Sequence, residues 1–523
     1  MRQLERLVDP LAVCYRVIHK NRANEFMRIA CVFNPFQYKL HEENLRVVQK
    51  YFGLFPPLSL AWVCAIAEKA GHDALLIDAR TLRLTREDVL DRLKQWKPDI
   101  LGFMMTTYMF RETLEWVTFL KKHLKLPVII GGYNLRVYPN ESLSVEGPDF
   151  GCFNSAFYTL PRLLEELEGR RRFADVPGLI YKENGRTTMT PYGRDPVFDD
   201  YPNPARHLLP NDLYAEFTTE RKNFTVMVTS KGCPNGCLFC EAGHTSYNPR
   251  SPQTVLGEIK ECRTRYGIRE IDFFDYDFCI DRKRTEAICD GIIQNGMDIT
   301  WACRTRVDCV DEALLRKMKA AGCSRIYFGI ESGVQEILDR LNKGISLQQI
   351  RDTIETTRSL GIRALGFFLV GSPGETRETF QQTVKFAKSL KLDYVQFSKL
   401  TAKPLTPYWR QAVDQTGVDY WREYILGNIE DKSLARPWTA LANDDIDRLA
   451  KKAYVTYHLR PMFLLRHTLQ VKSFGEFKRK FYAFLEMMLR QEPIGTLDEN
   501  FVAYPEDMGK LCLYNQNFKK NKP

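Results

Sequence analysis

The chain has 523 residues, of which 44% are hydrophobic and 27% charged, and its formal net charge is +10 at pH 7. This composition is typical of a globular protein, and at roughly 100–200 residues per domain the length predicts about three domains. Because no stretch reaches the roughly 18–20 apolar residues of a membrane-spanning helix, and the charged N-terminus lacks the apolar core of a secretory signal, we expect a cytoplasmic protein.

After an N-terminal extension, residues 1–26, apolar strands alternate with amphipathic helices over residues 27–172. This alternation predicts a doubly wound α/β domain, Rossmann-like or flavodoxin-like, in which ligands bind beyond the carboxyl ends of the strands. The predicted strands are residues 28–34, 74–78, 100–106, 127–131 and 150–154, and the predicted helices are residues 58–70, 86–96, 111–123 and 160–168.

Residues 173–223 are rich in proline and predict a hairpin at 178–190 followed by a linker. The alternation then resumes over residues 224–406, where six strand–helix units predict a partial (β/α)6 barrel of the TIM type. The predicted strands are residues 225–229, 270–275, 300–304, 325–330, 364–369 and 394–400, and the predicted helices are residues 253–266, 284–295, 311–321, 346–360 and 377–390. Residues 407–523 predict a helical domain with a less ordered tail.

Three closely spaced cysteines follow the first strand of the predicted barrel, and they are Cys233, Cys237 and Cys240. Their spacing is three residues and then two, and Gly232 and Gly236 allow the backbone to turn tightly between them. Three thiolates on one loop can hold a four-iron cube and leave one iron without a protein ligand. The alternative, a structural zinc site, needs a fourth ligand; His244 is a possible one, but its spacing from the cysteines is unusual. The other eleven cysteines are scattered, and we expect them to be reduced thiols in the core.

The stretch from Cys233 to Cys240 resembles the C-x3-C-x2-C signature of the radical S-adenosylmethionine superfamily. The resemblance implies that a [4Fe-4S] cluster on these cysteines binds S-adenosylmethionine and cleaves it reductively to a 5′-deoxyadenosyl radical. It also implies three cofactor-binding positions at later strand ends: Asp275 near the methionine moiety, Arg306 on a carboxylate and Glu331 on the ribose hydroxyls. The sequence singles out no catalytic residue.

The amino-terminal module resembles that of the cobalamin-binding subfamily. The residues that match lie after the third and fourth strands and are Thr106, Thr107, Gly131 and Gly132. Small residues there would admit the corrin edge, and hydroxyls would bond phosphate or amide groups. The G-x-G-x-x-G pattern is absent, so we do not expect a nicotinamide cofactor.

Two stretches depart from the pattern of that subfamily. Residues 34–44 lack the D-x-H-x-x-G pattern that supplies a histidine to cobalt, and we expect His41 to be a surface residue. The resemblance therefore implies cobalamin without lower histidine coordination. Residues 154–156 read Asn-Ser-Ala where relatives often carry R-G-E. The alternative is a flavodoxin-like domain that does not bind cobalamin.

Residues 448–490 hold ten Lys or Arg residues and two Glu residues, interleaved with aromatic residues. Such a segment packs on a neighbouring domain or lies on an anionic membrane surface, and both alternatives stay open. No nucleic-acid-binding module is recognisable, so we expect no nucleic-acid partner. The resemblance implies a small-molecule substrate, with a lipid-like one as the narrower case, and an electron donor such as ferredoxin or flavodoxin.

The leading hypothesis is a cobalamin-dependent radical S-adenosylmethionine enzyme that transfers a methyl group to an unactivated carbon of a hydrophobic or natural-product-like substrate. A second hypothesis is a radical cyclase of the anaerobic porphyrin-ester cyclase type, which would use the same cofactors. A third is a non-catalytic sensor of cobalamin or redox state. The complete cysteine triplet argues against a sensor, because sensing does not require an open iron.

Overall fold

The computed structural model describes residues 26–36 and 53–464, apart from residues 194, 217, 222, 430–434 and 462. The chain divides into two compact units, the first comprising residues 1–35, 59–196 and 201–209 and the second comprising residues 36–58, 197–200 and 210–523. No helix in the described part is long and apolar enough to span a bilayer.

The first unit is built on a seven-stranded sheet with the order β3-β1-β4-β5-β6-β7-β8. The five parallel strands are β1 (Arg28–Phe33), β3 (Asp73–Asp78), β4 (Ile100–Met104), β5 (Val128–Gly131) and β6 (Phe150–Cys152). They confirm the predicted doubly wound sheet. The predicted hairpin is also present, as β7 (Leu179–Glu183) and β8 (Arg186–Met189), but it continues the sheet because β7 pairs antiparallel with β6.

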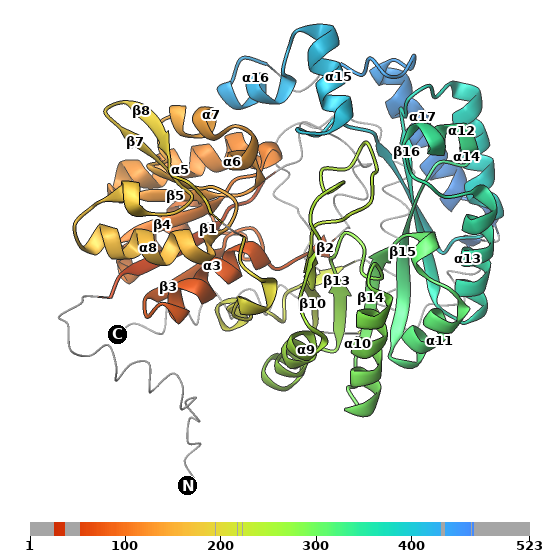
Figure 1. Ribbon diagram of the computed structural model, residues 1–523, viewed down its shortest axis with the longest axis horizontal. Coiled ribbons are helices and arrows are strands. Elements are labelled where there is room, and N and C mark those ends of the chain that lie inside the picture. The colour runs from red at the N-terminus through yellow and green to blue at the C-terminus, as the bar shows by residue number, and fades with distance from the viewer. Residues whose placement is uncertain are drawn as a thin grey trace. The chain divides into compact units, whose positions relative to one another are not determined.

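Helices connect these strands (Figure 1). They are α3 (Leu58–Lys69), α4 (Arg86–Trp96), α5 (Phe110–Leu124), α6 (Tyr133–Val137), α7 (Pro139–Ser144) and α8 (Ala156–Glu168). Of these, α4 and α8 begin at a residue whose side chain caps the helix. At α4, for example, Thr85 and Asp88 form a capping box that satisfies the first free backbone N–H groups. The sequence did not predict α6 and α7, because helices of five and six residues are too short to display a helical periodicity.

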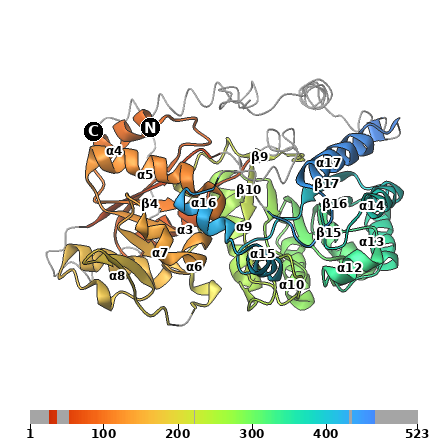
Figure 2. The same cartoon turned by 90° about the horizontal axis from the view of Figure 1, so that it is seen from above.

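The second unit is built on a six-stranded parallel sheet with the order β10-β13-β14-β15-β16-β17. The strands are β10 (Phe224–Met227), β13 (Glu270–Phe273), β14 (Thr300–Thr305), β15 (Cys323–Glu331), β16 (Arg363–Val370) and β17 (Tyr394–Lys399). The sheet curls, with helices on its outer side (Figures 1 and 2). Among the described residues no ladder joins β17 to β10, so the barrel is open, as predicted.

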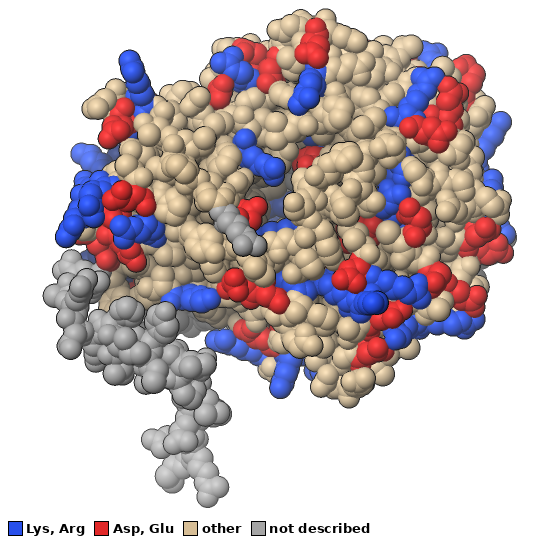
Figure 3. Space-filling view, in the orientation of Figure 1, with Lys and Arg blue, Asp and Glu red and all other residues tan. Residues whose placement is uncertain are grey.

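Side chains alternate between the two faces of this curled sheet. The outer face packs against the helices in one large core that includes Phe273, Trp301 and Phe328. The inner face carries a separate small apolar cluster that includes Ala302 and Tyr327. The helices of the wall are α9 (Pro252–Tyr266), α10 (Arg282–Gln294), α11 (Glu312–Ala320), α12 (Gln335–Arg340), α13 (Leu347–Ser359) and α14 (Arg377–Ser389). Their outward charges are mixed in sign, as Figure 3 shows for the visible face.

Two short antiparallel pairs complete the second unit: β11 (Ser230–Lys231) with β12 (Asn248–Pro249), and β2 (Gly53–Leu54) with β9 (Ala215–Glu216). Within the described residues, the helices that follow the barrel are α15 (Pro407–Thr416), α16 (Tyr420–Leu426) and α17 (Asn443–His458). The hydroxyl of Tyr457 on α17 donates to the carbonyl of Leu392, at the start of β17, so α17 packs on the barrel.

The described part of the basic segment predicted at 448–490 ends at residue 464. Within it, Ala450, Ala453 and Tyr457 are buried while Lys451 and Lys452 are exposed, which is the pattern of a packed helix with a solvated charged face. The remainder of the segment lies outside the described residues, as does the N-terminal extension up to residue 25. Membrane contact through this segment therefore stays a prediction.

Candidate functional site

The cysteine loop, residues 230–249, leaves the carboxyl end of β10 and closes on itself. The short pair β11–β12 joins its two ends. Within it, the backbone N–H of Cys233 donates to Oγ1 of Thr245 at 2.9 Å, and the N–H of Thr245 donates back to the carbonyl of Cys233 at 3.1 Å. The N–H of Cys240 donates to the carbonyl of Cys237 at 3.2 Å. The loop is thus held by its own hydrogen bonds, so the three thiols are carried by a constrained backbone.

Glycines permit this closure at positions where a side chain would collide with backbone. Gly232 has φ of +75°, and a Cβ there would lie 2.0 Å from the carbonyl oxygen of Ser246. A Cβ at Gly243 would lie 2.9 Å from the carbonyl oxygen of Cys237. The carbonyl of Gly236 accepts a hydrogen bond from Nδ2 of Asn342 at 2.7 Å, and a Cβ at Gly236 would lie 2.9 Å from that same nitrogen. The cysteine loop therefore also docks on the segment that follows α12.

The thiols lie beside cationic side chains. Nη1 of Arg306 is 3.6 Å from Sγ of Cys237, and Nδ2 of Asn235 donates to Sγ of Cys233 at 3.3 Å. Burial raises the pKa of Cys237, and the nearby Lys343 and Arg306 oppose that rise. Donors and positive charges at sulfur favour the thiolate, which is the form that binds metal. The surroundings of the loop are thus suited to holding sulfur as a ligand.

The donor chemistry of this loop fits an iron–sulfur cluster, as the sequence predicted. No three His, Cys, Asp or Glu side chains in the described part are already arranged as the ligands of a metal ion. The assignment to Cys233, Cys237 and Cys240 therefore rests on three thiols that share one closed loop next to two cations. It stays a prediction at the level of individual residues.

Asp275 lies just beyond β13 and is fully buried against the start of the cysteine loop. Its carboxylate accepts from the backbone N–H and the hydroxyl of Thr229 at 2.6 and 2.5 Å, and from the hydroxyl of Ser230 at 2.9 Å. The guanidinium of Arg284 donates to the carbonyl of Thr229 at 2.9 Å. Asp275 therefore fixes the segment that leads into the cysteine loop, and the predicted contact with a methionine moiety stays untested.

Glu331 ends β15 in a left-handed conformation, with φ of +68°, at an irregularity in the ladder with β16. Its Oε1 is 2.9 Å from Nζ of Lys343, and both side chains are less than one-tenth exposed. Burial lowers the pKa of Lys343, but the carboxylate of Glu331 and the thiol of Cys237 together raise it by more, so that it lies above its ordinary value. A Cβ at Gly329 would lie 2.6 Å from Oε1 of Glu331, so glycine makes room for this ion pair.

Arg306 joins the parts of this region. Its guanidinium pairs with both carboxylate oxygens of Asp308, at 2.9 and 2.8 Å, and donates to the carbonyl of Lys343 at 2.7 Å. The structure thus gathers Arg306, Glu331 and the cysteine loop at the carboxyl ends of β10, β14 and β15, where the barrel prediction places function. Sequence reasoning did not single out Lys343, because its only signal is a position in a turn after a short helix.

The first unit has its own candidate site, at the carboxyl ends of β1 and β4. These two strands flank the point where the strand order reverses, which is where doubly wound sheets bind ligands. Thr106 is half-buried just beyond β4, and a Cβ at Gly131 would meet no atom within 4 Å. At the end of β1, Oδ1 of the buried Asn34 has no hydrogen-bond partner among the described residues. The open space and the orphaned acceptor fit a large polar cofactor such as cobalamin.

The other two residues predicted for that site have structural partners. The hydroxyl of Thr107 is buried and donates to Oδ1 of Asn134 at 3.0 Å. Gly132 has φ of +130°, and a Cβ there would lie 2.4 Å from the carbonyl oxygen of Met105. Both residues shape the turns after their strands. His41 lies outside the described residues, so its predicted surface position stays a prediction.

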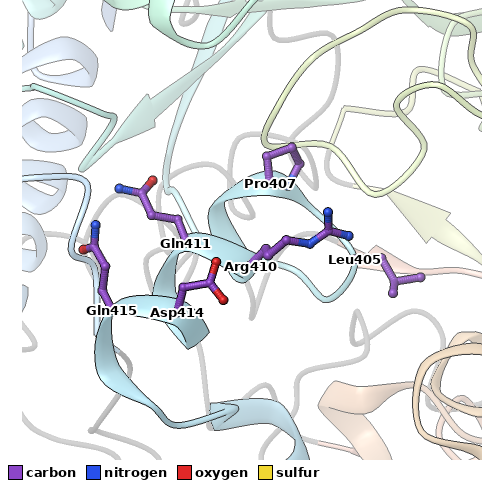
Figure 4. A pocket seen from close by; sticks show the side chains of 6 residues that line it. All are labelled: Leu405, Pro407, Arg410, Gln411, Asp414 and Gln415. Carbon is purple, nitrogen blue, oxygen red and sulfur yellow. The ribbon is translucent and has the colours of Figure 1, made fainter.

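A pocket of about 380 Å³ runs along α15 (Figure 4) and is lined by Leu405, Pro407, Arg410, Gln411, Asp414 and Gln415. None of the predicted site residues lines it. Leu405, which lines the pocket, comes two residues after Lys403. Nζ of Lys403 is 4.0 Å from Oε1 of Glu241, the residue that follows Cys240 in the chain. The loop after β17 therefore reaches the cysteine loop, while the pocket itself lies along α15 and the end of that loop.

Comparisons with known proteins match both domains of the chain. The sequence model of the Radical SAM superfamily matches residues 227–387, and the model of the B12 binding domain matches residues 45–164. An uncharacterized methyltransferase of Pyrococcus horikoshii is 33% identical over 431 residues, which are 80% of this chain and 91% of that protein. The anaerobic magnesium-protoporphyrin IX monomethyl ester cyclase of Rubrivivax gelatinosus is 25% identical over 71% of this chain and 69% of its own length.

The fold has counterparts among solved structures. The radical S-adenosylmethionine methyltransferase TsrM from Kitasatospora setae, with cobalamin and a [4Fe-4S] cluster bound, superimposes with a TM-score of 0.61. The match covers 75% of this chain and 78% of that one at 19% identity, so it establishes the fold. Together with the two domain matches and the 33% identical relative, these findings show that the chain belongs to the cobalamin-binding radical S-adenosylmethionine protein family.

Proposed function

We propose that the protein is a cobalamin-dependent radical S-adenosylmethionine enzyme that transfers a methyl group to an unactivated carbon. One observation carries the proposal: three thiols share a loop that glycines close at the carboxyl end of the first barrel strand, in a chain similar to a methyltransferase over four-fifths of its length. When bound, the cluster supplies the electron that cleaves S-adenosylmethionine, and cobalamin supplies a carrier for the methyl group.

In this proposal Cys233, Cys237 and Cys240 hold the cluster, and the side chains around the loop do the positioning. Asp275 keeps the entry of the loop in place through Thr229 and Ser230. The Glu331–Lys343 pair and Arg306 present charged groups next to Cys237, where the amino and carboxylate groups of S-adenosylmethionine need partners.

The curled sheet forms the chamber in which the substrate reacts. Its outer face is sealed by the helical wall, and its inner face includes the aromatic side chains Tyr327, Phe367 and Tyr394. Aromatic side chains that line such a chamber keep water away from a reactive radical.

We further propose that the first unit holds cobalamin beside Thr106 and Gly131, beyond the ends of β4 and β5. Support comes from the open space at Gly131 and from the domain match over residues 45–164. The proposed partners are a small-molecule substrate and a ferredoxin or flavodoxin as electron donor. The more specific form of the proposal is that the substrate is lipid-like. We propose a cytoplasmic location. The more specific form of this proposal is that residues 448–490 hold the protein against a membrane surface.

The test is anaerobic incubation of the reconstituted protein with methyl-labelled S-adenosylmethionine, a reductant and a small-molecule extract of the source cells. Formation of 5′-deoxyadenosine together with labelled product is expected. Formation of 5′-deoxyadenosine with an unlabelled product would favour the second candidate, ring formation, to which the similarity with the cyclase gives support. If no 5′-deoxyadenosine forms, the result would contradict the proposed function and favour the third hypothesis, a sensor.

A further inference from the structure

The inner face of the barrel carries Arg304 on β14, a cation whose side chain is 20% exposed. It lies two residues before Arg306 along the same strand, so it sits roughly 6–7 Å deeper in the barrel than the residue that contacts Cys237. The neighbouring inner-face residues Phe274 and Phe367 are also only partly buried. Arg304 is therefore accessible from the chamber in which the proposed chemistry takes place.

Most of the hydrogen-bonding capacity of Arg304 is already used. Nη1 and Nη2 donate to the two carboxylate oxygens of the fully buried Asp272, at 2.7 and 3.2 Å, and Nη1 also donates to the carbonyl of Phe273 at 3.2 Å. The guanidinium carbon lies 3.8 Å from the ring centroid of Phe274 and 4.8 Å from that of Tyr327. These contacts hold the guanidinium in one orientation.

Two N–H donors of Arg304 remain. A guanidinium carries five N–H groups, and the three hydrogen bonds above use both of those on Nη1 and one of those on Nη2. Among the described residues no acceptor takes the N–H of Nε or the second N–H of Nη2. These two donors lie side by side on one edge of the guanidinium, so together they can bind a single oxygen atom that has two lone pairs.

The charges around Arg304 decide which kind of oxygen is preferred. Asp272 neutralises Arg304, and the groups behind this pair are the buried Arg325 with the two carboxylates of Glu216 and Glu270. These five side chains together carry two positive and three negative charges, which gives a net charge of −1. Burial, with Glu216 adding to the rise, raises the pKa of Asp272 to about 6. A further anion here would be repelled, whereas a neutral acceptor is not.

We propose that Arg304 is the polar anchor of the substrate chamber, and that it binds a neutral carbonyl oxygen (amide, ester or ketone) of a substrate whose aromatic or conjugated body contacts Phe274 and Phe367. The inference rests on the proposed function, because it assumes that the substrate enters the barrel. It names a feature of the substrate and a specificity-determining residue, Arg304, with Asp272 as its positioning partner.

The test compares benzamide with benzoate, which have nearly the same shape and differ in charge. Saturation-transfer NMR titrations are run on the anaerobically reconstituted full-length protein with S-adenosylmethionine bound and no reductant. We expect benzamide to bind roughly tenfold more tightly than benzoate, because a buried anion without a free counter-charge is strongly disfavoured.

Two variants and one control complete the test. Arg304→Lys keeps the charge opposite Asp272 but lacks the second pair of donors, and should weaken benzamide binding roughly tenfold. The double variant Arg304→Met, Asp272→Leu removes the ion pair as a unit and should reduce benzamide binding at least as much. Arg316→Met, at an exposed ion pair with Glu312 on α11, should bind benzamide like the wild type.

Tighter binding of benzoate than of benzamide by the wild type would overturn the inference, as would unchanged benzamide binding in both Arg304 variants. If the double variant does not fold, Arg304→Lys decides the question alone. A reductant is then added to the same wild-type preparation and 5′-deoxyadenosine is measured. Its absence refutes the proposed function, whereas its presence without a preference for benzamide refutes the anchor alone.

Discussion

Nη1 of Arg306 lies 3.6 Å from Sγ of Cys237, and this contact connects the third strand of the barrel to the loop that follows the first strand. The same guanidinium donates to the carbonyl of Lys343, which in turn pairs with Glu331 at the end of β15. Three strand ends are thereby tied to one thiol. A change at any of these residues should therefore affect the cysteine loop.

Cys237→Ala should abolish the iron–sulfur absorbance of the anaerobically reconstituted protein and its formation of 5′-deoxyadenosine, because two thiolates are left for four irons. Corrinoid bound to the first unit should remain, as measured by its visible absorbance. The control is Cys262→Ala, which removes a thiol from the core of the barrel wall and should leave cluster content unchanged. Loss of cluster and corrinoid together in Cys237→Ala would contradict the assignment of the two cofactors to separate units.

Gly232→Ala should prevent loading of the cluster while the remainder of the fold persists. The added Cβ would lie 2.0 Å from the carbonyl oxygen of Ser246, and φ of +75° is unfavourable for alanine, so the ends of the loop cannot stay paired. Iron content and circular dichroism are the measurements. Gly257→Ala, inside α9 where a Cβ meets nothing within 4 Å, is the matched control and should stabilise that helix by up to about 1 kcal/mol. Equal iron content in the two variants would refute the role of Gly232.

Lys343→Met should lower the free energy of unfolding of the second unit by roughly 3–5 kcal/mol, because it leaves the buried carboxylate of Glu331 without its partner. Adding Glu331→Gln should recover much of this loss, since the unpaired charge is then removed. Denaturant unfolding followed by tryptophan fluorescence measures the cycle of single and double variants. A double variant that is as unstable as the sum of the two singles would show that the two side chains do not interact.

Glu375→Gln should change how stability depends on pH. Burial raises the pKa of Glu375 to about 7, although the N–H groups of Gly371 and Ser372 donate to it. The folded state therefore holds a proton that the unfolded state releases near pH 4.5, so the contribution of Glu375 to stability is greatest at low pH and falls as the pH rises towards 7. The total loss is of the order of 3 kcal/mol.

Glutamine cannot ionise, so Glu375→Gln should be more stable than the wild type at pH 8, and this advantage should shrink at pH 5.5. Unfolding midpoints of both proteins at the two pH values measure the effect. An advantage of equal size at both pH values would show that Glu375 does not titrate in this range.

Gly131→Leu should block corrinoid binding without unfolding the first unit. A Cβ at this position meets no atom within 4 Å, and its φ is not in the left-handed region, so a larger side chain can extend into the open space beyond β5. Retention of added hydroxocobalamin after gel filtration is the measurement. Gly131→Ala, which fills far less of that space, should keep more of the corrinoid. Full retention by Gly131→Leu would place the cofactor elsewhere.

Much of this architecture could be read from local patterns. Strand β1, for example, was predicted at 28–34 and is found at Arg28–Phe33, and α4 was predicted with the bounds that it has. Apolar runs and capping residues act over a few neighbouring positions, so a short stretch of sequence is enough to predict where β1 and α4 begin and end. The cysteine motif was equally visible, because its three cysteines lie within eight residues of sequence.

The remaining features depend on contacts between distant residues. Lys343 became part of the site only because α12 returns it to the end of β15, and Asp272 became the partner of Arg304 only because β13 and β14 are neighbours in the sheet. The pairing of β7 with β6 likewise follows from which strand edge is available.

By itself the sequence determined the type and order of the elements, the cysteine loop and the family, because these depend on short-range patterns of polarity and spacing. Only the tertiary structure decided which charges meet inside the barrel and which donors of Arg304 remain available. The physical reason is that the partners of a buried charge are set by strand neighbours and by desolvation, and neither is encoded in any short stretch of the chain.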